Sequence, residues 1–133
     1  MTTWFCDAMG WDGTCSGVYI MNSKNGALCE VWVEKYTSNQ LEYMALIATL
    51  EMAEEGDIIF SDSQLVVKQL LGEYEVRNEG LKPLHDEAKE LYDSKMVKVT
   101  WCPRSENKAG VEVSKHREAL NHEFIETTTE EPI

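Results

Sequence analysis

Short apolar runs separated by polar turns occupy the first quarter of the chain. Their length and composition predict three strands, over residues 4–7, 17–21 and 27–34. The connection between the second and third strands ends in Asn25-Gly26, a pair typical of hairpin turns. Because both connections are short, we expect the three strands to form an antiparallel meander.

The apolar spacing changes to that of a helix after this meander. Apolar residues recur every three or four positions from Leu41 to Met52, which places them on one face of a helix. Ser38 or Asn39 is expected to cap the start of this helix, and Gly56 is expected to mark its end.

Strands and helices alternate through the rest of the chain. A meander followed by strand–helix–strand connections predicts an α/β fold, with a mixed sheet flanked by helices and right-handed crossovers. We expect one domain over residues 1–124 and an acidic, flexible tail over residues 125–133. The remaining predicted elements are strands over 57–60 and 96–101 and helices over 64–71, 80–94 and 108–124.

The composition is that of a folded and strongly acidic domain. Hydrophobic residues make up 43% of the 133 residues, which excludes wholesale disorder. The chain has 24 acidic and 12 basic residues and a formal net charge of -12. Such a charge is repelled by phosphate backbones, so non-specific packaging of DNA and attachment to anionic membranes are poor fits.

Targeting segments and cysteine motifs are absent from the sequence. No apolar run reaches the ~20 residues of a membrane-spanning helix, and the first residues lack the basic and apolar regions of a signal peptide. The four cysteines form no C-x-x-C pair, which argues against structural zinc. We therefore expect reduced thiols and a cytoplasmic location.

Three carboxylates occupy positions that suit a shared site. Asp7 ends the first strand, Asp62 follows the strand over 57–60, and Glu42 is expected in the first turn of the helix after the meander. If the two strands pair in parallel, Asp7 and Asp62 emerge at neighbouring carboxyl ends, where open sheets form their ligand sites. Acids brought together repel one another unless cations neutralise them, and oxygen ligands suit Mg²⁺ or Mn²⁺.

Each of these acids also has a simpler explanation. Asp7 fits a turn at the end of a strand, Glu42 fits an acid favoured by the dipole of a helix N-terminus, and Asp62 fits a helix cap. Spacing alone leaves the metal site and the simpler explanations open.

Four motifs surround the three acids and the last predicted strand. They are Phe5-Cys6-Asp7-Ala8 with Gly17-Val18, Thr37-Ser38-Asn39-Gln40-Leu41-Glu42-Tyr43-Met44-Ala45-Leu46 (the pattern T-x-N-x-x-E-x-x-A-L), Ser61-Asp62-Ser63-Gln64-Leu65-Val66-Val67, and Trp101-Cys102-Pro103-Arg104-Ser105-Glu106-Asn107. The four motifs occur in this order and together span nearly the whole chain. They resemble those of the ribonuclease H family in its cellular type 1 and retroviral forms.

The resemblance implies the ribonuclease H-like fold, a five-stranded mixed sheet of order 3-2-1-4-5 flanked by helices in three layers. It also implies an endonuclease that hydrolyses the RNA strand of RNA–DNA hybrids with two divalent ions, Mg²⁺ or Mn²⁺. By this resemblance, Asp7 bridges both ions, and Glu42 and Asp62 each hold one of them. Such a pair of ions clamps the phosphoryl group during in-line displacement.

The resemblance also points to contacts with the hybrid near the scissile bond. Hydroxyl and amide groups at such positions can test for a ribose 2′-OH. Binding is expected to be weak and salt-sensitive, because residues 72–80 carry Arg77 alone against three glutamates. The expected nucleic-acid-binding residues are Ser38, Asn39, Ser63, Gln64, Arg104 and Asn107.

The chain departs from the family pattern at the last acidic motif. The family's fourth acid lies four residues after the Asn of the final turn, where this chain has Val111. One of the two ions would lose a protein ligand and bind weakly, and Glu106 and Glu112 are the candidate substitute ligands. No His lies between Trp101 and Asn107 to move a proton, so we expect slow catalysis.

Two alternatives to a slow ribonuclease H stay open. One is a catalytically degenerate member that keeps the fold and binds nucleic acid without cutting it. The other is a protein-interaction module whose acidic surface docks on a basic partner. Retention of three acids favours the metal site, and loss of the fourth favours degeneracy. We expect a monomer that acts on an RNA–DNA hybrid and does not associate with membranes.

Overall fold

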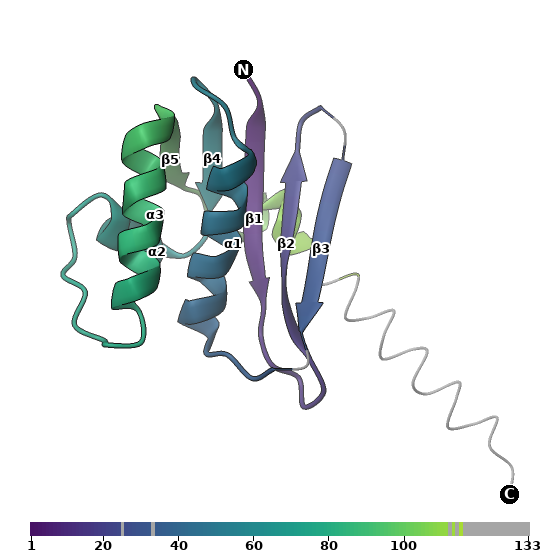
Figure 1. Cartoon of the computed structure of the whole chain (residues 1–133). Coiled ribbons are helices and arrows are strands. Elements are labelled where there is room, and N and C mark those ends of the chain that lie inside the picture. The colour runs from purple at the N-terminus through teal and green to yellow at the C-terminus, as the bar shows by residue number, and fades with distance from the viewer. Residues whose placement is uncertain (25, 33, 112, 114, 116–133) are drawn as a thin grey trace, which may run out of the picture.

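Five strands form a single mixed sheet in the computed structural model, which describes residues 1–24, 26–32, 34–111, 113 and 115. The strands are β1 (Thr3–Met9), β2 (Ser16–Asn22), β3 (Gly26–Trp32), β4 (Ile58–Ser61) and β5 (Lys98–Trp101). Their order is β3-β2-β1-β4-β5 (Figure 1). The first three strands pair antiparallel, whereas β4 pairs in parallel with both β1 and β5. The predicted meander and the order 3-2-1-4-5 are therefore confirmed.

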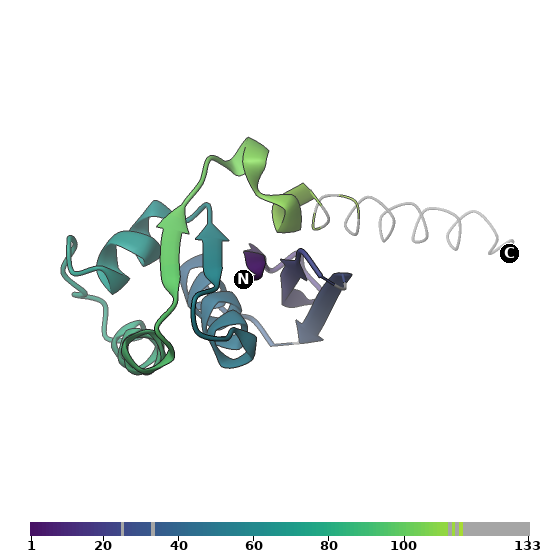
Figure 2. The same ribbon diagram turned by 90° about the horizontal axis from the view of Figure 1, so that it is seen from above.

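The helices lie on both sides of this sheet. They are α1 (Ser38–Met52), α2 (Gln64–Leu70) and α3 (Lys82–Lys95), followed after β5 by the short 3-10 turn η1 (Arg104–Glu106) and by helical residues 108–111. Figure 2 shows α1 and α3 on one side of the sheet and residues 108–111 on the other, as three layers require. Residues 116–124 of the predicted last helix and the tail over 125–133 lie outside the described residues.

The core lies between the sheet and α1. Leu46 and Leu50 of α1 are fully buried, in one apolar cluster with Ile20 of β2 and Ile59 of β4. This packing holds α1 against β1 and β2, and it brings the N-terminal part of the helix close to the carboxyl end of β4. No helix in the described part of the chain is long and apolar enough to cross a membrane.

The cap of α1 differs from the prediction. Thr37, rather than Ser38 or Asn39, precedes the helix in an extended conformation. The Gln40 backbone N–H donates to Thr37 Oγ1 at 3.1 Å, and the Thr37 N–H donates to Gln40 Oε1 at 3.0 Å. This reciprocal capping box satisfies two backbone donors and leaves the side chains of Ser38 and Asn39 outside the cap.

Most other boundaries also differ by one or two residues, and two of these differences have a visible backbone cause. The helix α1 ends before Ala53, which is extended, and Gly56 lies in a separate turn with a φ of 88°. The strand β5 begins at Lys98 because Met96, with a φ of 57°, ends α3 in the left-handed region.

Candidate active site

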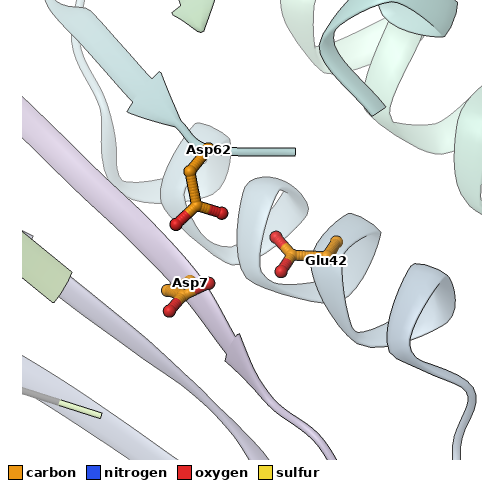
Figure 3. A group of neighbouring side chains, drawn as sticks. All are labelled: Asp7, Glu42 and Asp62. Atoms are coloured by element: carbon orange, nitrogen blue, oxygen red, sulfur yellow. The ribbon is translucent and has the colours of Figure 1, made fainter. Parts of the chain in front are cut away.

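The carboxylates of Asp7, Glu42 and Asp62 converge at one end of the sheet (Figure 3). Each offers one oxygen within 4.8 Å of the oxygens offered by the other two. Asp7 belongs to β1, Glu42 belongs to α1, and Asp62 immediately follows β4. We call these three side chains the carboxylate cluster.

Parallel pairing of β1 with β4 brings the two aspartates together. Cys6 lies opposite Ser61 in the register, so Asp7 and Asp62 are the next residues along neighbouring strands. The helix α1 packs against β1 and carries Glu42 to the same place. Residues from three distant parts of the sequence therefore meet where ligand sites of open sheets form.

The simpler explanations for the three acids do not hold in this structure. Asp7 lies within β1, which continues to Met9, so its predicted place at the end of the strand is wrong. Glu42 lies one residue beyond the first turn of α1, which contains no acid, so its predicted place in that turn is wrong. The favourable effect of a helix dipole falls off within that turn. Asp62 does not cap α2, because Ser63 Oγ accepts the Val66 N–H at 3.3 Å.

Burial and the repulsion between neighbouring acids raise the pKa of two members of the carboxylate cluster, Asp7 and Glu42. Asp7 is only 3% exposed, and burial, together with the charge of Asp62, raises the pKa of its carboxyl. Burial and the charges of Asp7 and Asp62 raise the pKa of Glu42 to about 9. Without a cation, the group therefore retains a proton at neutral pH.

The donor set fits a divalent cation. Glu42 Oε2 is buried and receives no hydrogen bond from an N–H or hydroxyl group of the described residues, and the proton that Glu42 retains is shared with the carboxylate of Asp7. No lysine or arginine in the described part of the chain forms an ion pair with the cluster. Carboxylate oxygens are the ligands of hard cations, and an ion between them would neutralise their repulsion and bind Glu42 Oε2.

The cysteines near the cluster are uncharged. Cys6 and Cys102 are buried free thiols, and Cys15 is also free. Burial raises the pKa of Cys102 to about 11, with a further contribution from Asp62, and burial raises the pKa of Cys6 well above its usual range. The two buried thiols pack as small apolar groups, as the sequence predicted.

Most of the residues expected to contact nucleic acid lie on the surface. The side chains of Ser38, Asn39, Gln64 and Arg104 are exposed, and Ser63 is half-buried as the cap of α2. The positive charge of Arg104 lowers the pKa of Asp7, in opposition to burial, so this side chain acts on the cluster.

Asn107 is the exception among these residues. Its side chain is 0% exposed and is hydrogen-bonded within the protein, so the structure does not present it on the surface, and its contact with nucleic acid stays a prediction. The sequence signal for this buried, hydrogen-bonded role was the place of Asn107 just before a predicted helix, because Asn is a preferred helix cap.

No substitute for the fourth acid is found among the described residues. Val111 is 46% exposed and cannot ligate an ion. Glu106 is exposed in η1 and does not join the carboxylate cluster, and Glu112 lies outside the described residues. The described site therefore offers three carboxylates to an ion.

Comparisons with known proteins agree with this arrangement. A family model described as Reverse transcriptase-like matches residues 10–117. RNase H1 from the halophilic archaeon Halobacterium salinarum NRC-1 has a TM-score of 0.69 and 26% identity, with 81% of this chain and 89% of that chain covered.

Two further solved structures share the fold. The N-terminal RNASE H domain of rv2228c from Mycobacterium tuberculosis has a TM-score of 0.68 and 20% identity, with 87% of this chain and 97% of that chain covered. LC11-RNase H1, solved in complex with an RNA/DNA hybrid, has a TM-score of 0.68 and 22% identity, with 85% of this chain and 93% of that chain covered. The family match over most of the sequence, together with the shared fold, shows that the chain belongs to the ribonuclease H family.

Proposed function

We propose that this chain is a divalent-metal-dependent endonuclease that hydrolyses the RNA strand of RNA–DNA hybrids. Asp7, Glu42 and Asp62 would hold Mg²⁺ or Mn²⁺, with Asp7 shared between two ions. The observation that carries this proposal is the convergence of three carboxylates around a buried Glu42 oxygen to which no N–H or hydroxyl group of the described residues donates. The shared fold of LC11-RNase H1, which binds an RNA/DNA hybrid in its solved structure, supports the choice of substrate.

The residues of the chain have separable tasks in this reaction. When bound, divalent ions polarise the phosphoryl oxygen and lower the pKa of a bound water. The carboxylate cluster would hold the ions beside the carboxyl end of β4. Exposed Ser38 and Asn39 can hydrogen-bond a ribose 2′-OH, which separates RNA from DNA. Arg104 can bind a backbone phosphate beside Asp7.

The direct test is cleavage of a labelled RNA–DNA hybrid in the presence of Mg²⁺ or Mn²⁺. We expect slow cutting of the RNA strand with either ion and none after chelation by EDTA. Duplex DNA of the same sequence, which lacks the 2′-OH, should stay intact. If the protein cuts the hybrid neither with Mg²⁺ nor with Mn²⁺, at protein concentrations that saturate binding, the proposal is refuted.

Restoring the fourth acid should speed the reaction. Val111→Asp is expected to raise the cleavage rate about tenfold, because it adds a carboxylate ligand for the second, weakly held ion. Val111 is 46% exposed, so the substitution should leave the core intact. The measurement is the initial rate of hybrid cleavage over a titration of Mg²⁺.

Val111→Asn is the matched control for this prediction. Asparagine has nearly the same shape as aspartate and lacks its charge, so the cleavage rate of Val111→Asn should stay near that of the unaltered protein. Equal rates for the two variants would show that position 111 does not reach an ion.

Loss of the fourth acid also favours a second candidate, a degenerate member that binds hybrids without cutting them. Val111 is the observation behind it. This candidate predicts hybrid binding that persists in EDTA and no cleavage with either ion. Binding measured by fluorescence anisotropy, beside the cleavage assay, separates the two functions.

A further inference from the structure

Asn107 joins three segments of the chain at the edge of the carboxylate cluster. Its Nδ2 donates to the carbonyl oxygen of Cys6 at 2.9 Å and to Asp62 Oδ2 at 3.2 Å. Its Oδ1 accepts the backbone N–H groups of Ala109 at 3.0 Å and Gly110 at 3.4 Å. One fully buried amide therefore connects β1, the residue after β4 and the start of the last helix.

The backbone and the side chain of Asp62 are held by different groups. Trp101 Nε1 donates to the Asp62 carbonyl oxygen at 3.1 Å, and the Cys102 N–H donates to the Ser61 carbonyl oxygen at 3.0 Å, so β5 fixes the backbone. Among the described residues, the Asn107 amide is the hydrogen-bond donor to the Asp62 carboxylate. The direction of that carboxylate therefore depends on Asn107.

Gly110 brings the same turn close to the cluster. A Cβ at this position would lie 3.1 Å from Asp7 Oδ2 and 3.7 Å from Asp62 Oδ2. Only a residue without a side chain allows such an approach without a shift of its neighbours. The turn that begins at Asn107 therefore packs directly against the two aspartates, so a shift of this turn would move their carboxylates.

We propose that Asn107 is a positioning residue for the metal site: it holds the Asp62 carboxylate beside Asp7, in the orientation that an ion requires. Like charges repel, so an unrestrained Asp62, which is partly exposed, would turn toward water. A carboxylate has two oxygens, so one can accept the Asn107 hydrogen bond while the other coordinates an ion. This inference rests on the proposed metal site, and it concerns a residue that holds a ligand without being one.

Serine is the informative replacement at position 107. Ser and Asn cap helices about equally well, so Asn107→Ser keeps an acceptor for the start of the last helix. A serine hydroxyl is too short to reach both Cys6 and Asp62. The variant therefore separates capping from positioning.

Asp57 provides a matched control at the opposite end of the same pair of strands. Its carboxylate is 4% exposed and accepts the Thr2 N–H at 2.8 Å, Trp4 Nε1 at 3.0 Å and the Glu54 N–H at 2.9 Å. Like Asn107, it is a buried polar link between β1 and the β4 region. Asp57→Asn should lower stability without touching the carboxylate cluster.

The experiment is a calorimetric titration of the folded protein with Mn²⁺, with thermal unfolding in EDTA recorded for each variant. We expect Asn107→Ser to bind Mn²⁺ about tenfold more weakly, the effect typical of residues that orient metal ligands. Asp57→Asn should bind Mn²⁺ like the unaltered protein even though it melts at a lower temperature. Unchanged affinity in Asn107→Ser, or an equal loss in Asp57→Asn, would overturn the inference.

A measurement on the unaltered protein covers the case in which Asn107→Ser does not fold. The side-chain amide signals of Asn107 in an NMR titration with Mg²⁺ should shift with the binding curve, whereas the indole N–H of Trp4 at the far end of the sheet should not. Absence of the Asn107 shift would overturn the inference. Binding of Mn²⁺ without hybrid cleavage would refute the proposed function and leave the inference standing, whereas absence of Mn²⁺ binding would remove both.

Discussion

Asp7→Asn is expected to reduce hybrid cleavage by at least about 10³-fold, or ~4 kcal/mol of transition-state stabilisation. Asp7 is the most buried of the three acids, and its strand β1 contacts both β4 and α1. Asparagine keeps the shape and one oxygen but removes the charge that neutralises a cation. The measurement is the cleavage rate at saturating hybrid with Mg²⁺ and with Mn²⁺.

The same substitution should stabilise the metal-free protein. Burial and the charge of Asp62 already raise the pKa of Asp7, which shows that its ionised form is unfavourable in the fold. Asp7→Asn should therefore melt at a higher temperature in EDTA while it loses activity. Asp93→Asn removes an equal charge from α3, outside the cluster, and should change neither property strongly. Cleavage by Asp7→Asn within tenfold of the unaltered protein would contradict the proposed function.

Glu42→Gln should remove most of the pH dependence of stability in the absence of metal. Burial and the charges of Asp7 and Asp62 raise the pKa of Glu42 from its ordinary value of 4.5 to about 9 in the folded protein. Between these values the folded state binds a proton that the unfolded state has released. The free energy of unfolding therefore falls as pH rises through this window, by at most about 1.4 kcal/mol per pH unit. Glutamine does not bind this proton, so the free energy of unfolding of Glu42→Gln should change little with pH over the same range.

Chemical unfolding in EDTA at several values between about pH 5.5 and about pH 8.5 measures this slope. Glu90→Gln, at an exposed glutamate of α3, should keep the slope of the unaltered protein. Saturating Mg²⁺ should flatten the curve of the unaltered protein as well, because an ion replaces the proton. Equal slopes for Glu42→Gln and the unaltered protein would show that Glu42 ionises normally.

The types and order of the elements could be predicted because their signals are local. Alternation in the meander and helical spacing after residue 39 depend on side chains a few positions apart. The ends were less predictable. Thr37, Ser38 and Asn39 can all cap a helix, and the choice of Thr37 depends on which residue takes the extended backbone conformation before α1.

The candidate site shows the same division. The acids could be selected because Asp7 and Asp62 each come directly after the last paired residues of two parallel strands and because their motifs resemble those of ribonuclease H. The role of Asn107 could not be predicted, because its local sequence is compatible both with an exposed contact to nucleic acid and with a buried link between segments. Burial of the residue distinguishes the two roles.

The sequence by itself determined the strand and helix order and the meander, and it selected the three acids of the candidate site, because periodicity and motif spacing are properties of neighbouring residues. Only the tertiary structure decided that burial and two neighbouring aspartates raise the pKa of Glu42, that no N–H or hydroxyl group of the described residues reaches its Oε2, and that Asn107 is hydrogen-bonded to Asp62. Desolvation and repulsion depend on distances between groups that are remote along the chain, and folding alone sets those distances.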